Sequence, residues 1–223
     1  MTTTAPSPRV RVRRAPKRAV YERAQIDAIL DEAIVCHVGF VCDGQPYVMP
    51  TLHARVGDVV YLHGSTASRM VRTLASGAPC SLTATLLDGI VLARSAFHHS
   101  ANYRSVTVLG PARLVVSEDE RLRALKAFTE QLVPGRWEHV RAPNAKEMKG
   151  TQVLALTLDE ASAKVRTGPP VDDDEDMGRD VWAGELPLAL QAGDPRPDPQ
   201  LSAGIGPPPH VTRWSASRRP VDG

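Results

Sequence analysis

The sequence is short of several residue types on which common folds and sites depend. Of its 223 residues only three are cysteine, and 4% are aromatic. Cys36, Cys42 and Cys80 are too few and too scattered for a disulfide framework, and no C-x-x-C pair indicates a zinc or thiol-redox site. We expect buried, reduced thiols. With so few aromatic side chains, the core must rest on Val, Leu, Ile and Ala.

Membrane and export signals are also missing. No run approaches the ~20 apolar residues of a membrane-spanning helix, and the basic N-terminus lacks the apolar stretch of a secretory signal. We therefore expect a cytoplasmic protein that makes no membrane contact. The formal net charge is +2, which gives no overall reason to expect a polyanion as partner.

Several motifs of well-known enzyme classes are absent. There is no G-x-G-x-x-G after a strand and no P-loop, so neither dinucleotide fold nor phosphate loop is supported. The absence of G-x-S-x-G disfavours a serine hydrolase. His98 and His99 are neighbours in a strand-like segment and point to opposite faces, so they cannot both ligate one ion. We expect no metal site.

What is present is a β-rich middle between two polar ends. We divide the chain into a basic flexible arm (1–20), one folded domain (21–167) and an extended tail rich in Pro, Gly and Asp (168–223), which docks partly around 181–190. The arm has no aromatic residues between its charges, so binding of nucleic acid is not favoured.

Strand and helix patterns alternate within the domain. Helices are expected at 22–33, 65–76, 117–132 and 144–149, and strands at 34–41, 47–56, 59–63, 80–87, 90–93, 95–116, 153–158 and 163–165. A turn is expected at Asp88-Gly89. Short, hairpin-linked strands of alternating polarity predict a mainly β fold, an antiparallel barrel with peripheral helices.

The stretch "HGSTASRMVRTL" has the pattern of a phosphate site. A strand ends at Gly64, and Ser65, Thr66 and Ser68 lead into a helix with Arg69 in its first turn. Hydroxyls, helix-start amides and a guanidinium together can hold a phosphate. The alternative is a serine N-cap followed by a surface arginine.

The stretch "SAFHHSANYRSVTVLG" (95–110) changes character half-way. Its second half is apolar and β-branched, as in a buried strand, whereas its first half gathers His, Ser, Asn, Tyr and Arg side chains. Such groups resist burial unless they find hydrogen-bond partners. The sequence therefore raises the question of what those partners are.

A resemblance of two segments to a known family indicates what those partners are. "YVMPTLHARVGDVVYLHGSTASRM" and "SAFHHSANYRSVTVLGPARLVV" resemble the pyridoxamine 5′-phosphate oxidase-like flavoproteins, in particular flavin-nucleotide-binding proteins and nitroimidazole-resistance reductases. The resemblance covers about Ala19 to Trp182. It implies a six-stranded split β-barrel that forms a homodimer, with FMN in two equivalent clefts between the subunits.

The resemblance also implies roles for individual residues. Ser68 and Arg69 match the family's phosphate pair, and Arg104 and Ser105 match an arginine and a polar residue beside the flavin ring. The strand at 48–53 would offer backbone groups to the ring. The cofactor-binding residues expected in all are Met49, Pro50, Thr51, Leu52, His53, His63, Ser65, Ser68, Arg69, Asn102, Tyr103, Arg104, Ser105 and Trp182.

Two departures from the oxidase pattern limit the resemblance. Met70 stands where the oxidase has a lysine, so Ser65 or His63 would complete the phosphate grip. The oxidase's C-terminal Arg-x-His motif has no counterpart, so pyridoxamine phosphate is not the expected substrate. We expect an FMN-dependent oxidoreductase acting on another small organic molecule. A non-catalytic flavin-storage module, a haem-binding relative and a deazaflavin cofactor remain open alternatives.

Two histidines and one tryptophan have open roles. His53 or His99 could donate a proton to a substrate, because imidazole titrates near working pH. The simpler alternative is that each only hydrogen-bonds flavin or backbone. Trp182 could lie at the rim of the cofactor cleft, where its indole N–H would find a partner, or could only anchor the tail.

Overall fold

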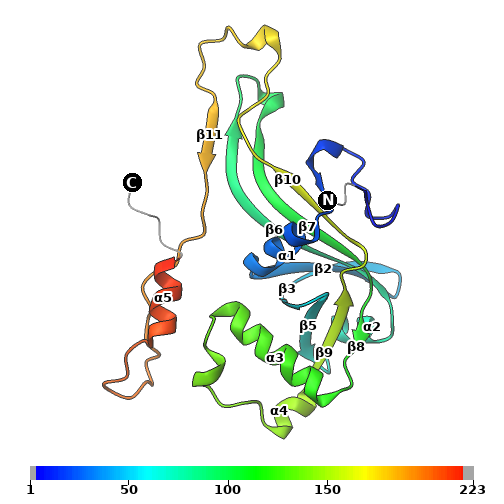
Figure 1. The fold of residues 1–223 in the computed structure, drawn as a ribbon, viewed down its shortest axis with the longest axis vertical. Coiled ribbons are helices and arrows are strands. Elements are labelled where there is room, and N and C mark those ends of the chain that lie inside the picture. Colours follow the sequence, from blue (N-terminus) through cyan, green and yellow to red (C-terminus); the bar gives the residue numbers. More distant parts are fainter. Residues whose placement is uncertain (1–3, 218–223) are drawn as a thin grey trace.

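The chain folds into two antiparallel sheets with helices at their edges (Figure 1). The computed structural model describes residues 4–217. The main sheet has the order β1-β10-β7-β6-β2-β3, with β11 paired to β6 beside this path, and the second has the order β4-β5-β9-β8. The strands are β1 (Ala19–Val20), β2 (Val35–Cys42), β3 (Gln45–Leu52), β4 (Ala54–Val56), β5 (Val59–Ser65), β6 (Pro79–Leu92), β7 (Ser100–Pro111), β8 (Arg113–Leu114), β9 (Thr151–Thr157), β10 (Ala161–Arg166) and β11 (Gly184–Pro187).

Within residues 4–217, five α-helices accompany these strands. They are α1 (Arg23–Glu32), α2 (Arg69–Ala75), α3 (Glu118–Leu132), α4 (Ala145–Gly150) and α5 (Pro209–Ser217), with single 3₁₀ turns η1 (Pro16–Arg18), η2 (Ala96–His98), η3 (Trp137–His139) and η4 (Asp174–Asp176). The mainly β fold with peripheral helices is confirmed. No helix in the described part of the chain is both long and apolar enough to cross a bilayer.

The turn predicted at Asp88-Gly89 is wrong. Strand β6 continues through both residues with only a register shift between Leu87 and Gly89, and it pairs with β7 into a long hairpin that projects beyond the rest of the sheet (Figure 1). The reason lies in the tail, because β11 pairs with this part of β6. A Cβ on Gly89 would come 3.1 Å from the carbonyl oxygen of Leu186, so glycine here permits close approach of a strand.

The strand predicted at 47–56 is in fact two strands. β3 belongs to the main sheet and β4 to the second, and the chain passes between the sheets at His53. The imidazole of His53 is 1% exposed, and its Nε2 lies 2.9 Å from the carbonyl oxygen of Leu30 at the end of α1. This contact with α1 holds His53 between the two sheets and so determines where β3 ends and β4 begins.

Two apolar clusters pack on opposite faces of β5. Val60 and Leu62 belong to the main core between the sheets, which α1 and α2 also cover. Tyr61 belongs to a second cluster, in which Phe128 of α3 packs against the outer face of the second sheet. Because successive side chains of a strand point to opposite faces, each position along β5 is assigned to one side or the other.

Segments near both ends of the described part of the chain, residues 4–217, pack against the domain. At the N-terminal end β1 pairs with β10, and Val10 is only 5% exposed. At the C-terminal end α5, which the sequence analysis does not predict, lies beside the loop that follows α3 (Figure 1). The rings of His139 and His210 stack there with centroids 4.4 Å apart.

Candidate cofactor site

The predicted phosphate cradle forms at the junction of β5 and α2. Ser68 is the N-cap of α2, and its Oγ accepts a hydrogen bond from the Val71 amide at 3.5 Å. The Oγ of Ser65 accepts from the Ala67 amide at 3.2 Å. Each hydroxyl accepts in these bonds, so each keeps its own proton to donate to a ligand.

A glycine allows α2 to lie this close to β5. A Cβ on Gly64 would lie 2.8 Å from Cγ2 of Val71, a separation that real side chains do not adopt. The absence of a side chain at Gly64 therefore sets the position of the helix start that carries Ser68 and Arg69.

Arg69 is an exposed cation in a defined position. Its guanidinium carbon lies 4.6 Å from the centre of the Tyr47 ring, a cation–π contact. Within residues 4–217 no carboxylate forms an ion pair with it. A positioned guanidinium without a counter-ion is suited to bind a phosphate.

Strand β3 provides an open edge beside Tyr47. In the described residues it pairs with β2 alone, so its second edge presents backbone N–H and C=O groups that no strand satisfies. Val48 is 67% exposed and Met49 45% exposed. Met49, Pro50, Thr51 and Leu52 thus lie on a free edge, as a strand that offers backbone groups to a ring would require.

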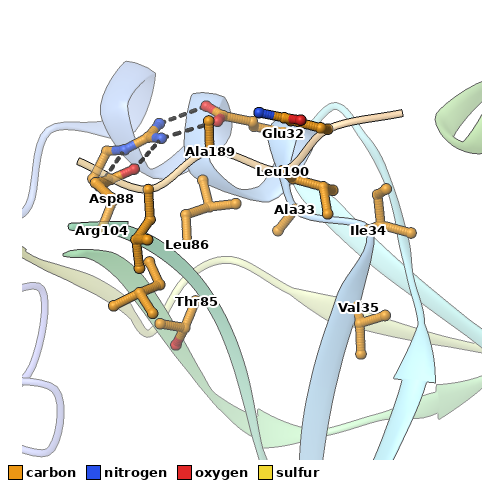
Figure 2. Close-up of a pocket in the computed structure, with 13 residues that line it drawn as sticks. Glu32, Ala33, Ile34, Val35, Thr85, Leu86, Asp88, Arg104, Ala189 and Leu190 are labelled. Atoms are coloured by element: carbon orange, nitrogen blue, oxygen red, sulfur yellow. Dashed lines mark hydrogen bonds and ion pairs between the residues drawn. The ribbon is translucent and has the colours of Figure 1, made fainter. Parts of the chain in front are cut away.

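Arg104 has a different environment from Arg69. It donates to Glu32 at 2.5 and 2.9 Å and to Asp88 at 2.7 and 3.0 Å, as the dashed lines in Figure 2 show. These bonds, first that to Glu32 and then that to Asp88, raise the pKa of the guanidinium. Neither carboxylate is predicted from the sequence as a partner of Arg104, because only the fold brings them together.

Arg104 lines a cleft with a volume of about 950 Å³. Its walls are the segment 32–35, strand β6 at 85–88 and the tail at 188–191, which crosses above Arg104 and Leu86 in Figure 2. The floor is mostly apolar, and the ion cluster lies at one end.

Arg69 and Arg104 lie far apart in one chain. Tyr47 contacts Arg69 and is paired in the sheet with Phe40 of β2. Phe40 is paired with Cys80 of β6, and Cys80 is paired with Gly110 of β7, so these residues lie side by side across the sheet. Gly110 is six residues beyond Arg104, which is roughly 20 Å at 3.3 Å per residue. The two arginines therefore cannot hold the same phosphate within one chain.

The polar entrance of β7 finds most of its partners inside the chain. The Asn102 side chain, 6% exposed, accepts from Arg166 of β10 and donates to Glu185 of β11 at 2.5 Å. Ser105 Oγ donates to the Lys164 carbonyl at 3.3 Å. Tyr103 is half-buried and lies in the segment of β7 that pairs with β10.

The candidate histidines occupy three different environments. His53 is enclosed, and burial lowers its pKa although the contact with Leu30 opposes this. His99 is exposed, with Nδ1 2.9 Å from the Ser95 carbonyl oxygen. The ring of His63 packs edge-on against Phe128 of α3, with centroids 4.3 Å apart. Since Gly64 faces α2, His63 faces the other side of β5.

Trp182 does not line the cleft that contains Arg104. It is 68% exposed and rests its ring against Gly184 at the start of β11. Among residues 4–217 no group of three His, Cys, Asp or Glu side chains gathers closely enough to hold a metal ion.

Comparison with known proteins relates this arrangement to flavoproteins and haem proteins. The flavocytochrome Anf3 from Azotobacter vinelandii is 42% identical, with 94% of this chain and 97% of that chain covered and a TM-score of 0.89. The FAD and heme binding protein from Mycobacterium smegmatis is 39% identical, with 88% and 96% covered and a TM-score of 0.84. The search of curated proteins gives no match.

More distant structures share the fold alone. A candidate 5-nitroimidazole antibiotic resistance protein from Bacteroides thetaiotaomicron is 20% identical, with 66% of this chain and 86% of that chain covered and a TM-score of 0.56. The family model described as pyridoxamine 5′-phosphate oxidase matches residues 22–165. On this match, and on the two relatives of about 40% identity, the chain belongs to the pyridoxamine 5′-phosphate oxidase family.

Proposed function

We propose that this protein is a flavin-binding oxidoreductase of the flavocytochrome type, which also binds haem. The observation that carries the proposal is the identity of 42% and 39%, over 94% and 88% of the chain, to a flavocytochrome and to an FAD and heme binding protein. A bound flavin would supply hydride and electron transfer and a haem one-electron chemistry, while the protein binds and orients both.

The flavin phosphate belongs, in this proposal, at the junction of β5 and α2. Arg69 is the cation without a counter-ion, and Ser65 and Ser68 have hydroxyl protons to donate. Met70 is 7% exposed and packed in the core, so it makes no polar contribution. The same groups serve the phosphate of FMN and the ring-proximal phosphate of FAD.

The flavin ring belongs along the free edge of β3, whose backbone groups no other strand satisfies. Arg104 and Ser105 lie about 20 Å along β7 from Gly110, the residue that is level with Tyr47 and Arg69. We assign them to the flavin bound mainly by a second copy. This distribution supports a homodimer with the cofactor between the subunits. The exposed apolar residues Val35, Val48 and Leu87 of the main sheet favour the same assembly.

The substrate remains a small organic molecule, and pyridoxamine phosphate is not proposed. His53 is enclosed by α1 and has no route to a substrate, so it orders the chain between the sheets. His99 is exposed at the entrance of β7 and is the proton donor that stays available.

One purification tests the proposal. The protein should have the absorbance of flavin and of haem as isolated or after incubation with FMN, FAD and haemin, and light scattering should give the mass of a dimer. Denaturation and mass spectrometry of the released chromophores distinguish FMN, FAD and deazaflavin. Protein that stays colourless overturns the flavin proposal, and a monomer that holds flavin at micromolar concentration overturns the shared site.

A second measurement separates an enzyme from a storage module. Reduction by NADH or NADPH, followed by steady-state turnover with a quinone or nitroaromatic acceptor, is expected of an oxidoreductase. A protein that binds flavin stoichiometrically but turns over none of these acceptors would support the storage alternative.

A further inference from the structure

An apolar cavity lies on the side of β5 away from α2. Its volume is about 440 Å³, within the range of small-molecule and cofactor pockets. It is lined by β3 and β5, by α3, by the loop after α3 and by α5; in Figure 1 α3 lies below β5, and α5 lies to the left of both. Eight of its lining residues are apolar: Leu52, Leu125, Phe128, Leu132, Val133, Trp137, Pro143 and Val211.

His63 contributes the one imidazole that lines this cavity. Its Nδ1 is buried and has no hydrogen-bond partner among residues 4–217. Burial without a hydrogen-bond partner is unfavourable for a polar nitrogen. Neutral imidazole is the form that ligates metals.

Among the described residues, Arg136 is the only cationic side chain that lines the cavity. It lies just beyond α3, is half-buried, and forms no ion pair among residues 4–217. Arginine is the side chain best suited to a carboxylate, which it binds through two parallel hydrogen bonds. An anionic group on an otherwise apolar ligand would therefore be accommodated here.

From these features we infer that the cavity between β5, α3 and α5 is a haem site, with His63 as axial ligand and Arg136 facing the propionates. The inference rests on the proposed function for the choice of haem. The apolar walls would pack against the haem macrocycle, the imidazole of His63 would ligate the iron, and the guanidinium of Arg136 would bind the two propionate carboxylates. Val211 belongs to α5, outside the segment 22–165 that matches the family model. Helix α5 therefore contributes a part of the cavity wall that the segment matched by the family model does not provide.

The location separates the two cofactors. Ser68 and Arg69 hold their ligand on the α2 side of β5, and His63 faces the α3 side. One strand thus lies between a flavin phosphate and a haem. This assignment moves His63 out of the phosphate cradle, where the sequence analysis had placed it.

Haemin titration of the full-length protein tests the site through its absorbance. The wild type should bind one haemin per chain with a Soret band, and His63→Ala should shift the band and weaken binding at least tenfold. Free imidazole should restore the band, because it can occupy the space vacated by the side chain. His37→Ala, which removes an exposed histidine of β2, is the control and should match the wild type.

Two further variants address the cavity without changing His63. Arg136→Gln should weaken haemin several-fold but leave the affinity for haemin dimethyl ester unchanged, since the ester has no carboxylates. Leu132→Trp adds bulk to the wall and should block uptake. It also keeps the inference testable if His63→Ala does not fold, as judged by circular dichroism and flavin binding.

The possible failures are distinguishable. If the wild type binds flavin but no haemin, the haem part of the proposed function is wrong, and the inference is wrong with it. If the wild type binds haemin while His63→Ala and Leu132→Trp bind it with unchanged band and affinity, only this location is wrong. Loss of the band in His210→Ala, with His63→Ala unaffected, would overturn the assignment in favour of the stacked pair His139 and His210.

Discussion

Arg69 lies over the face of Tyr47, with its guanidinium carbon 4.6 Å from the ring centre, and so connects the start of α2 to the free-edged strand β3. The contact orients the cation without neutralising it. This distinguishes Arg69 from Arg104, whose charge is balanced by Glu32 and Asp88. The difference determines which arginine we expect to bind the flavin phosphate.

Replacement of Arg69 should therefore reduce phosphate-dependent affinity. Arg69→Ala is expected to weaken FMN or FAD by about 1.5–3 kcal/mol, the range for charge-assisted hydrogen bonds. Riboflavin, which has no phosphate, should bind the variant and the wild type alike. Fluorescence titration measures both. Arg72→Ala, an exposed arginine one turn further along α2, is the control. Equal losses for riboflavin and FMN would contradict the assignment.

The phosphate cradle could be predicted because its parts are neighbours in the sequence. Gly64, Ser65, Ser68 and Arg69 lie within six residues, and a serine before a helix is a local signal. The strands could be predicted for the same reason, since alternation of polarity is read over a few residues.

The parts that were missed depend on distant contacts. A turn at Asp88-Gly89 follows from local residue preference, but pairing with β11, almost one hundred residues later, holds the segment extended. The break at His53 depends on Leu30, and the hydrogen bonds of Asn102 depend on Arg166 and Glu185. No local pattern in one sequence encodes these partners.

The buried histidines predict how stability depends on pH. Burial lowers the pKa of both His53 and His63 below the value of about 6.5 expected in the unfolded chain. Below pH 6.5 the unfolded state therefore binds protons that the folded state does not. Stability should be complete above that pH and fall below it, by at most about 1.4 kcal/mol per pH unit for each histidine.

Urea unfolding of the cofactor-free protein between pH 7.5 and 5.0 measures this dependence. Carboxylates with lowered pKa, such as Glu120 and Glu147, affect stability only below their usual values near 4.5, so they contribute little in this window. His53→Gln can still donate a hydrogen bond to the Leu30 carbonyl and should reduce the slope. An unchanged slope in this variant would show that His53 is not one of the titrating groups.

The tail strand β11 should depend on Glu185. Asn102 is buried, and its side-chain amide donates to Glu185 at 2.5 Å. Glu185→Ala leaves that amide N–H without its partner and should destabilise the protein by about 1–3 kcal/mol. Tryptic cleavage at Arg179 should become faster. Glu175→Ala, an exposed acid in the same tail, should behave as the wild type in both assays. Unaltered melting and cleavage of Glu185→Ala would show that strand pairing alone holds β11.

The position of α2 should depend on the absence of a side chain at Gly64. A Cβ there would lie 2.8 Å from Cγ2 of Val71, and Val71 is fully buried, so neither group can move away. Gly64→Ala should destabilise the protein by about 1–3 kcal/mol and weaken flavin binding, because the displaced helix carries Ser68 and Arg69. Val71→Ala removes the clashing methyl group, so the double variant should lose less stability than the sum of the two single changes. Gly178→Ala, where an added Cβ meets nothing within 4 Å, is the control. Chemical denaturation and flavin titration of the four proteins measure the coupling, and strictly additive losses would show that the contact between Gly64 and Val71 does not position the cradle.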